Sequence, residues 1–493
     1  MITTQLAVVG AGPGGYAGAF LAADLGLSVT LIDPEANPGG VCVYRGCIPS
    51  KALLHVAKLV DEAKHAHGWG IDFGQPKIDL EKLRGFKDGV VKRLTGGTGQ
   101  LVKARKITYL RGLAAIVDAH HLRVSLEGGR TEEVQFEHAM LATGSVPAIP
   151  PALKVNDPRV MDSSAALDLP DVPKSLLVVG GGYIGLELGS VYATLGSAVT
   201  VVEMTPGLLP GADRDLVEVL AKRIGSLMKS VLLETKVVSM TPEPKGISVT
   251  FEGKVDQKQQ TFDRVLVAVG RRPNSAIPGL DKTHVQVDQR GFIMIDEQRR
   301  THEPSIFAIG DVVGEPMLAH KASHEARVAV EVMAGENVAF APRAIPAVVF
   351  TDPELAWAGL TEAQAQKDGR DVTIAKFPWA ASGRAITLDR TDGLTKLVLD
   401  PESERVLGVG LVGPGAGEMI AEGVLAIEMG ANATDLKLSI HPHPTLTETV
   451  MESAEVFFGQ ATHVYRPRRK TYCSPSGLPP REGLKACATM APQ

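Results

Sequence analysis

The chain has 493 residues, of which 44% are hydrophobic and 22% are charged, and it carries a formal net charge of −5 with a pI near 6.3. It is too long for one hydrophobic core, so we expect about three domains. The mild negative charge argues against a nucleic-acid partner and predicts no polybasic membrane-binding patch. Residues 1–5 hold no basic segment, so we expect no signal or transit peptide and a cytoplasmic protein.

The first predicted element is a buried strand at residues 6–9, followed by the pattern G-x-G-x-x-G at Gly10, Gly12 and Gly15. A helical pattern and a second apolar strand come next, and that strand ends at Asp33. In such a unit the glycines allow a tight turn and close approach of the backbone to a pyrophosphate, which faces the helix N-terminus. The acid accepts a hydrogen bond from a ribose hydroxyl. The segment therefore predicts a dinucleotide site.

Two of the four cysteines, Cys42 and Cys47, lie five residues apart just after this unit. A chain so poor in cysteine is not held together by disulfides, so we expect a redox-active pair. In an ideal helix these positions are about 8 to 9 Å apart at Cα, beyond the roughly 7 Å limit for a disulfide. The bond needs a distorted turn, which Gly46 permits and Pro49 favours, and a strained bond is readily reduced. A metal-binding pair or two inert thiols are the alternatives.

The same unit occurs a second time. A buried strand at residues 177–179 leads into Gly180, Gly182 and Gly185, and a second strand ends at Glu203. The first glycine and the acid are equally far apart in the two copies. Glycine turns alone are common, but two complete copies in register predict two bound dinucleotides.

The surroundings of the two units assign the dinucleotides. No cation follows Glu203 until Arg214, so the 2′-phosphate of NADP would meet a carboxylate, and the second unit is expected to prefer NAD. The first unit leads into the cysteine pair, so its cofactor must exchange electrons with a dithiol as well as with a nicotinamide. A flavin does both, and we assign FAD to the first unit.

The last third of the chain has a different pattern. Between residues 343 and about 465, strand-like runs at 347–350, 395–399 and 406–411 accompany a helical stretch at 419–429, which predicts an α+β domain without a nucleotide motif. Residues 466–493 are rich in proline, glycine and basic residues, and we expect them to be mostly disordered. Their two cysteines, Cys473 and Cys487, are interpreted as incidental thiols, with a metal relay as the alternative.

Over roughly residues 5–460 the chain resembles the dihydrolipoyl dehydrogenases, within the pyridine nucleotide–disulfide oxidoreductase family. The motifs that carry the resemblance occur in the family's order. They are residues 10–15, 39–54 around the cysteines, Ala142-Thr143-Gly144-Ser145, 180–187, 269–274, 308–311 and 441–448.

The resemblance implies an α/β fold with two Rossmann-like dinucleotide-binding domains, the FAD domain split in sequence and the NAD domain inserted, plus a C-terminal α+β dimerisation domain. The implied boundaries are 1–147 for the first part of the FAD domain with the redox disulfide, and 148–274 for the NAD domain. Residues 275–345 form the second, central part of the FAD domain, 346–465 the dimerisation domain, and 466–493 the tail.

The resemblance also implies roles for individual residues. Cys42 becomes the exchange sulfur and Cys47 the flavin-facing sulfur, while Lys51 lies near the flavin N5 and pairs with Glu187. Asp311 contacts the ribityl chain. From the residues alone, Lys51 is interpreted as a solvated lysine. Asp311 could equally be an ordinary acidic residue in a turn or a ligand of the flavin. The implied FAD-binding residues are Gly10, Gly12, Gly15, Asp33, Gly40, Lys51, Ala114, Gly144, Gly310, Asp311 and Ala319. The implied NAD-binding residues are Gly180, Gly182, Gly185, Glu203, Val237, Gly270 and Arg271; no metal is implied.

A second chemical centre is expected at His443. A dithiol attacks only as the thiolate, so its oxidation needs a base poised near neutral pH. A histidine oriented by a carboxylate supplies one, and Glu448 follows five residues later. From the residues alone a turn histidine beside prolines is the alternative; the resemblance implies the base, and a homodimer in which it reaches the cysteines of the other subunit.

The implied reaction is the reoxidation of protein-bound dihydrolipoamide to lipoamide through a Cys42–Cys47 disulfide and FAD, with hydride passed to NAD to give NADH. The lipoyl group would arrive on the lipoyl-bearing subunit of a 2-oxo acid dehydrogenase or glycine cleavage complex; no membrane partner is expected. One alternative is a reductase of another disulfide such as glutathione, but these favour NADP and Glu203 argues against it. A structural flavoprotein without turnover is the other, and the complete catalytic set argues against that.

Two residues suggest further hypotheses. Between the cysteines the family commonly has small or apolar residues, whereas this chain has Arg45, whose guanidinium is expected to stabilise the flavin-facing thiolate. A solvated surface arginine is the alternative. Related disulfide reductases place a tyrosine in the second glycine turn, so Tyr183 is expected to close the nicotinamide pocket until NAD arrives, with simple packing as the alternative.

Overall fold

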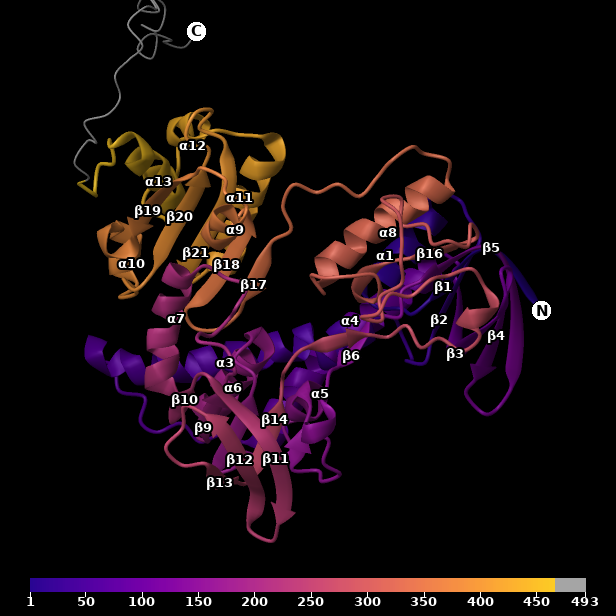
Figure 1. Ribbon diagram of the computed structural model, residues 1–493, viewed down its shortest axis with the longest axis horizontal. Helices are drawn as coiled ribbons and strands as arrows, with labels where there is room; N and C mark the ends of the chain where they lie inside the picture. Colours follow the sequence, from indigo (N-terminus) through magenta and orange to yellow (C-terminus); the bar gives the residue numbers. More distant parts are fainter. Residues whose placement is uncertain (466–493) are drawn as a thin grey trace, which may run out of the picture.

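A mainly parallel sheet centred on β1 forms the first region of the fold (Figure 1). The computed structural model describes residues 1–465. β1 pairs in parallel with β2 and β5, and β16 joins β5 from far along the chain. The strands are β1 (Ile2–Val9), β2 (Val29–Asp33), β3 (Thr108–Asp118), β4 (His121–Leu126), β5 (Thr131–Leu141) and β16 (Ile306–Ala308). The late arrival of β16 shows that this domain is split in sequence, as the resemblance implied.

Helices α1 (Pro13–Asp24) and α8 (Ala319–Met333) pack side by side on this sheet, although they lie far apart in sequence (Figure 1). Their approach depends on small residues. A Cβ at Gly18 would lie 2.4 Å from Met140 Cε and 3.3 Å from Ala326 Cβ, so a larger residue has no room there. The short 3-10 helix η4 (Gly310–Val312) connects β16 toward α8 and carries Asp311.

The second region holds the repeated glycine unit on a parallel sheet in the order β10-β9-β8-β14-β7. Its strands are β7 (Val160–Met161), β8 (Ser175–Val179), β9 (Ala198–Val202), β10 (Ser230–Leu232) and β14 (Arg264–Val267). An antiparallel sheet packs beside it, formed by β11 (Thr235–Glu243), β12 (Gly246–Gly253) and β13 (Gln259–Phe262). The helices are α5 (Ser163–Leu167), α6 (Tyr183–Leu195) and α7 (Arg214–Leu227).

The chain crosses between these two regions twice. The crossings are β6 (Ser145–Pro147) and β15 (Arg271–Pro273), which pair antiparallel. The predicted domain boundaries at 147 and 274 fall at these crossings, but the boundaries themselves stay predictions.

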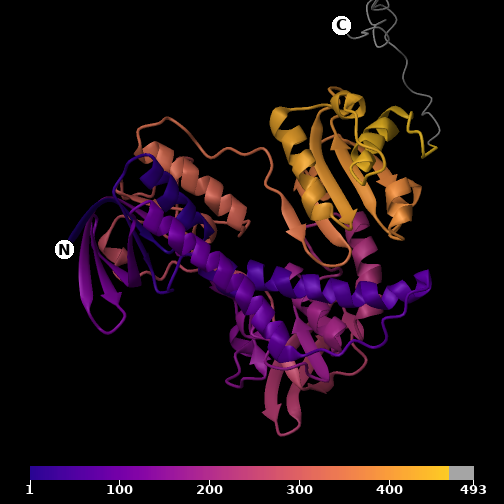
Figure 2. The ribbon, with the colours of Figure 1, turned by 180° about the vertical axis from the view of Figure 1, so that it is seen from behind.

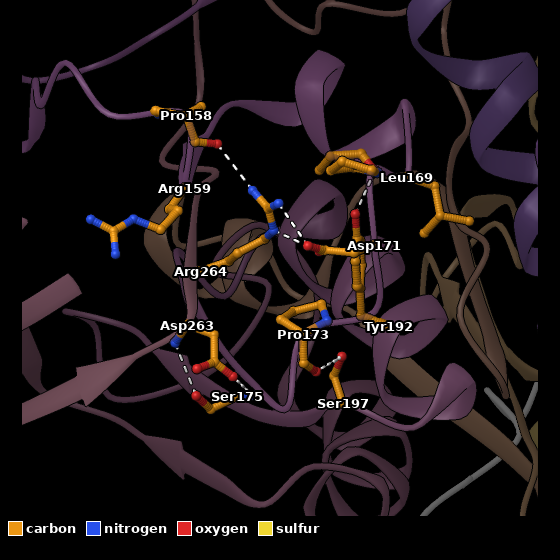
Figure 3. A network of polar contacts seen from close by, with 12 residues as sticks. Pro158, Arg159, Leu169, Asp171, Pro173, Ser175, Tyr192, Ser197, Asp263 and Arg264 are labelled. Atoms are coloured by element: carbon orange, nitrogen blue, oxygen red, sulfur yellow. Dashed lines mark hydrogen bonds and ion pairs between the residues drawn. The ribbon is translucent and has the colours of Figure 1, made fainter. Parts of the chain in front are cut away.

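A polar network fastens the amino ends of β8 and β14 (Figure 3). Arg264 donates to both carboxylate oxygens of Asp171, at 2.6 and 2.8 Å, and to the Pro158 carbonyl. Ser175 and Asp263 exchange two backbone-to-side-chain hydrogen bonds. Because this edge is closed by side chains, the opposite, carboxyl edge with its glycine turn is the edge left for a ligand.

Two long helices run behind both regions (Figure 2). The short α2 (Gly40–Arg45) leads into α3 (Cys47–His65), and α4 (Leu80–Ala104) packs against α3. Residues of α3, Leu53 and Ala57, belong to the same apolar core as the helices of the second region. The segment that carries the cysteines is therefore held between the two dinucleotide-binding regions.

The third region is an antiparallel sheet in the order β17-β18-β21-β20-β19 (Figure 1). Its strands are β17 (Ala347–Val349), β18 (Glu354–Gly359), β19 (Thr373–Pro378), β20 (Leu394–Leu399) and β21 (Val406–Gly413). Its helices are α9 (Glu362–Lys367), α10 (Gly383–Thr387), α11 (Ala416–Met429), α12 (Ala433–Leu438) and α13 (Glu448–Phe458). Among residues 1–465, no helix is both long and apolar enough to cross a membrane.

The strands predicted at residues 6–9, 177–179, 347–350, 395–399 and 406–411 and the helix predicted at 419–429 are confirmed, with bounds that differ by a few residues. The α+β character of the third region is confirmed as well. The expectation of a disordered tail at 466–493, with its two cysteines, lies outside the described residues.

Candidate active site

The helix that carries the cysteines is broken between them. Cys42 lies in α2, Cys47 is the first residue of α3, and Gly46 between them has a non-helical backbone (φ −144°, ψ −114°). A Cβ at Gly46 would lie 2.9 Å from the Val41 carbonyl oxygen, so glycine is needed for this break. The distorted turn expected from the sequence is present, and the structure shows the pair as two free thiols.

The two thiols are electrostatically unequal. A hydrogen bond from Cys42 is the main cause that lowers the pKa of Cys47, to about 7, and the charge of Lys51 lowers it further. The same hydrogen bond, together with burial, raises the pKa of Cys42. In the dithiol form Cys47 is therefore the cysteine that ionises first.

The side chain of Arg45 has a carboxylate partner. Its guanidinium forms an ion pair with Glu35 and lies 5.9 Å from the Tyr44 ring centroid. Lys51 is the cation named as acting on both thiols, and Arg45 lines the same cavity as they do, so the Arg45 hypothesis stays a prediction.

Lys51 is held by a buried carboxylate. Its Nζ lies 2.7 Å from Glu187 Oε2, and Glu187 is only 3% exposed. The Ser50 hydroxyl donates to the same oxygen at 2.9 Å, and the Phe350 N–H donates to Oε1 at 3.0 Å. The Phe350 ring centroid lies 4.5 Å from Lys51 Nζ. The ion pair of Lys51 with Glu187 therefore connects α3 with α6, and the Phe350 N–H adds the third region to the same contact.

A cavity of about 570 Å³ joins the first glycine turn to the cysteines. Both cysteines, Lys51, Glu187 and Tyr183 line it. All of the residues expected to bind FAD line it as well: Gly10, Gly12, Gly15, Asp33, Gly40, Lys51, Ala114, Gly144, Gly310, Asp311 and Ala319.

The glycine-turn end of this cavity fits a dinucleotide. Gly10 has φ +99°, and its Cβ would lie 2.4 Å from the Ala142 carbonyl oxygen, so the turn is as tight as a pyrophosphate requires. The first turn of α1 holds no acidic residue, which leaves the positive end of the helix for a phosphate. Asp33 Oδ2 accepts from the Ala11 N–H at 2.7 Å, which fixes the carboxylate beside the turn.

Asp311 also lines this cavity. Its carboxylate accepts from the Ser145 hydroxyl, and Arg271 donates to that hydroxyl and to the Ser145 carbonyl, each at 2.7 Å. Arg271 was expected among the NAD residues, but the structure places it in the same cavity as the expected FAD residues, beside Tyr183. The proposed action of Tyr183 on the nicotinamide pocket stays a prediction.

The other expected NAD residues mostly gather at the carboxyl edge of β8. Gly180 (φ +111°), Gly182 and Gly185 form the turn, and Glu203 Oε2 accepts from the Gly181 N–H at 2.8 Å. Gly270 (φ +124°) follows β14 in the same sheet. Val237 differs, because its side chain is 5% exposed and packs in the apolar core of the second region.

His443 and Glu448 form the expected pair. His443 Nδ1 lies 2.9 Å from Glu448 Oε1, and the Thr445 N–H donates to Oε2 at 2.8 Å. Burial opposes ionisation, but these two hydrogen bonds lower the pKa of Glu448. The His443 side chain is 75% exposed, and neither residue lines the cavity of its own chain.

Sequence reasoning assigned no role to several side chains that hold the site together. Ser145 and Ser50 lie inside the motifs that carry the family resemblance. Their position next to expected site residues was the signal that could have identified them. Phe350 and Glu325 carry no such signal. Glu325 is fully buried, accepts from the Gly310 N–H at 2.6 Å, and pairs with Lys321 and Arg299, so it fixes the turn that carries Asp311.

Comparisons with known proteins agree with this geometry. Residues 4–326 match the pyridine nucleotide-disulphide oxidoreductase family, and residues 345–454 match the dimerisation domain of the same family. The chain is 49% identical over 469 residues to a dihydrolipoyl dehydrogenase of Haemophilus influenzae, covering 95% of this chain and 98% of the relative. It is 46% identical over 465 residues to that of Geobacillus stearothermophilus, covering 94% and 98%.

Solved structures are similar over nearly the whole chain. LpdA of Mycobacterium tuberculosis matches with a TM-score of 0.85 at 26% identity, covering 92% of this chain and 99% of that one. A Cu(II) complex of the HOCl-induced flavoprotein disulfide reductase RclA of Escherichia coli matches with a TM-score of 0.83 at 28% identity, covering 92% and 100%. With both of its domain types matched, this chain belongs to the pyridine nucleotide-disulphide oxidoreductase family.

Proposed function

We propose that the chain is an NAD-dependent dihydrolipoyl dehydrogenase, which reoxidises protein-bound dihydrolipoamide and passes the electrons through FAD to NAD. The observation that carries the proposal is that Cys42, Cys47 and Lys51 line the same cavity as a dinucleotide-binding turn. A dithiol and a flavin can therefore meet in one enclosed space. The names of the relatives supply the substrate.

The residues that line the cavity would hold FAD, with the α1 N-terminus available to its pyrophosphate and Asp33 to its ribose. Lys51 and Asp311 lie where they can hold the rest of the group. When bound, FAD accepts an electron pair from a dithiol and supplies hydride to a nicotinamide. The chain's own residues bind it, orient it and bring the thiols to it.

The dithiol exchange takes place at the cysteines. A substrate thiolate attacks the Cys42 sulfur of the disulfide, which forms a mixed disulfide and releases Cys47 as a thiolate. The low pKa of Cys47 makes it the better leaving group. The second substrate sulfur then displaces Cys42 and leaves as the cyclic disulfide. The substrate loses two electrons, and the cysteine pair gains them.

The proton of the substrate thiol goes to a histidine of another subunit. His443 of the partner subunit is the base in this proposal, because His443 is exposed, is oriented by Glu448, and does not line its own chain's cavity. The dimerisation domain supports a homodimer. An exposed imidazole can enter the partner's cavity only across such an interface.

The preference for NAD has support in the position of Arg214. Its guanidinium donates to the carbonyls of Leu208, Leu209 and Ala212, so it is not free to bind a 2′-phosphate. Glu203 stays beside the second glycine turn, where a carboxylate accepts from a 2′-hydroxyl and repels a phosphate.

The partner that brings the lipoyl group is, in this proposal, the lipoyl-bearing subunit of a 2-oxo acid dehydrogenase or glycine cleavage complex. The cytoplasmic location expected from the N-terminal sequence belongs to the same proposal. The relatives carry the name of the activity, and the choice of complex rests on no residue of this chain.

The test is an anaerobic stopped-flow experiment on FAD-loaded protein mixed with dihydrolipoamide and then with NAD. We expect a long-wavelength thiolate–flavin absorbance band, followed by NADH. If the band forms only with another thiol donor, such as reduced glutathione or a different dithiol, the substrate assignment is wrong and the mechanism holds. If no dithiol produces the band, the cysteine pair does not communicate with the flavin and the whole proposal fails.

A further inference from the structure

A fully buried lysine joins the second region to the third. Lys396, on β20, is 1% exposed, and its Nζ lies 2.8 Å from Asp213, 3.1 Å from Asp215 and 2.7 Å from Glu362. The two aspartates stand at the start of α7, and Glu362 begins α9. A buried ammonium without partners would be very unfavourable, so these three carboxylates must stay in place around it.

Asp213 joins the two regions through hydrogen bonds as well as through its ion pair with Lys396. Its carboxylate also accepts from the Glu362 and Ala363 N–H groups, at 3.1 and 3.2 Å, and so caps the N-terminus of α9. One turn further along α7, the Leu216 side chain packs so closely on β21 that a Cβ at Gly410 would lie 2.5 Å from its Cδ1. The start of α7 therefore cannot move without the third region.

The segment before α7, residues 203–213, is itself rigid. The Arg214 guanidinium donates to the carbonyls of Leu208, Leu209 and Ala212 and so closes the segment into a compact hook. We use the term hook for residues 203–213. We therefore expect a displacement of Asp213 to reach Leu208 and Leu209 through these hydrogen bonds.

The hook contacts the second glycine turn. The Leu209 N–H donates to the Gly181 carbonyl at 3.1 Å, and Glu203 accepts from the Gly181 N–H at 2.8 Å. A Cβ at Gly181 would lie 2.6 Å from the Leu208 side chain, so the hook and the turn are in van der Waals contact. The hook therefore binds both backbone polar groups of Gly181, its N–H and its carbonyl.

We propose that Lys396 is a positioning residue for NAD. By fixing Asp213 it holds the hook, and the hook holds the second glycine turn and Glu203 in the geometry that binds the pyrophosphate and the ribose. A residue of the dimerisation domain thus sets the affinity of the NAD site without touching the nucleotide. The inference rests on the proposed NAD site, but on neither the dithiol substrate nor the cysteine chemistry.

The experiment compares FAD-loaded, full-length Lys396→Met with the wild type. The dissociation constant for NAD is measured by calorimetry, the flavin reduction by dihydrolipoamide by stopped flow, and the melting temperature by calorimetric scan. We expect NAD to bind about five- to thirty-fold more weakly, as is typical of coupling through a packed network. The rate of flavin reduction by the dithiol is expected to stay within about two-fold, because the cysteines are not part of this network.

Lys376→Met is the matched control. Lys376 makes the same kind of contact with the cluster, at 2.6 Å from Asp215, but its side chain is 39% exposed and it does not reach Asp213. The same chemical change there is expected to leave the NAD dissociation constant within about two-fold of the wild type, since an exposed pair contributes little.

A lower melting temperature with an unchanged NAD dissociation constant would show that Lys396 only stabilises the fold, and would overturn the proposal. If Lys396→Met does not fold, Asp213→Asn replaces it, because the amide keeps the shape and loses the charge. A roughly three-fold weaker NAD affinity in that variant supports the proposal, and an unchanged affinity overturns it. If the wild type binds NAD but is not reduced by dihydrolipoamide, the proposed substrate fails and the Lys396 comparison still decides this inference.

Discussion

The ion pair between Lys51 and Glu187 should control the ionisation of Cys47 in opposite directions. The charge of Lys51 lowers the pKa of Cys47, and the charge of Glu187 raises it. Removing the carboxylate by Glu187→Gln should therefore favour the thiolate, whereas removing the ammonium by Lys51→Met should disfavour it. Each variant changes one charge at almost constant volume.

The size of the effect follows from the geometry. A nearby unit charge typically shifts a pKa by about one unit or more, so we expect the pKa of Cys47 to move about one unit down in Glu187→Gln and about one unit up in Lys51→Met. At 2.7 Å and an effective dielectric constant of about 20, the attraction within the pair is about 6 kcal/mol. Burial of Glu187 opposes much of this and Lys51 stays 32% exposed, so the loss in unfolding free energy should be about 2 to 3 kcal/mol.

The assay is a pH titration of the dithiol form of the FAD-loaded enzyme. The long-wavelength absorbance of the thiolate beside the flavin is followed between about pH 5 and pH 9, and the alkylation rate of each cysteine is measured by mass spectrometry. The absorbance should rise through a midpoint near pH 7 in the wild type, since that is the pKa of Cys47. Urea unfolding gives the stability.

Ser50→Ala is the control, because it removes a 2.9 Å hydrogen bond to Glu187 and changes no charge. Its stability should fall by about 1 kcal/mol with the midpoint almost unchanged. If Glu187→Gln and Lys51→Met move the midpoint in the same direction, or leave it at the wild-type value, the charges of the pair do not set the thiolate. The hydrogen bond from Cys42 would then account for the low pKa alone.

Three further changes test other parts of the site. Gly46→Ala places a Cβ 2.9 Å from the Val41 carbonyl oxygen, and should lower the unfolding free energy by about 1 to 3 kcal/mol in a urea titration; an unchanged midpoint would mean that the broken turn does not need glycine. Glu448→Ala leaves the ring of His443 without its carboxylate, and should lower kcat for dihydrolipoamide about 10- to 100-fold while flavin reduction by NADH is unaltered. An equal loss in both half-reactions would argue for general damage. Glu203→Ala should raise the KM for NAD about ten-fold and leave that for dihydrolipoamide unchanged, and equal affinity before and after the change would remove Glu203 from the site.

Much of the fold was predictable because its signals are local. The glycine turns, the strands before them and the acids after them lie within one short segment each, and the backbone conformation they require is a property of those residues. The broken turn between Cys42 and Cys47 was expected for the same reason, and Gly46 provides it. The assignment of FAD and NAD followed from the residues next to each turn, and the family to which the chain belongs uses both.

The contacts that the sequence did not reveal concern side chains whose partners are distant in sequence. Arg45 lies between the cysteines in the sequence, yet its charge is taken up by Glu35. Arg271 was expected among the NAD residues, which stays a prediction, and the pairing of β15 with β6 brings its side chain to Ser145. The side chain of Val237 packs in an apolar core, and its expected place at the NAD site stays a prediction. No local pattern contains this information, because the direction of a side chain depends on which surface its strand meets.

The sequence by itself determined the two dinucleotide units, the redox cysteine pair and the α+β character of the last domain, because each depends on backbone constraints within a short segment. Only the tertiary structure decided how these parts are joined. Glu187 binds Lys51 and the Phe350 N–H, which come from other parts of the chain. The ammonium of Lys396 binds carboxylates from both the second and the third region. Buried charges and hydrogen-bonding groups must find partners wherever packing leaves them, and packing is set by the whole chain.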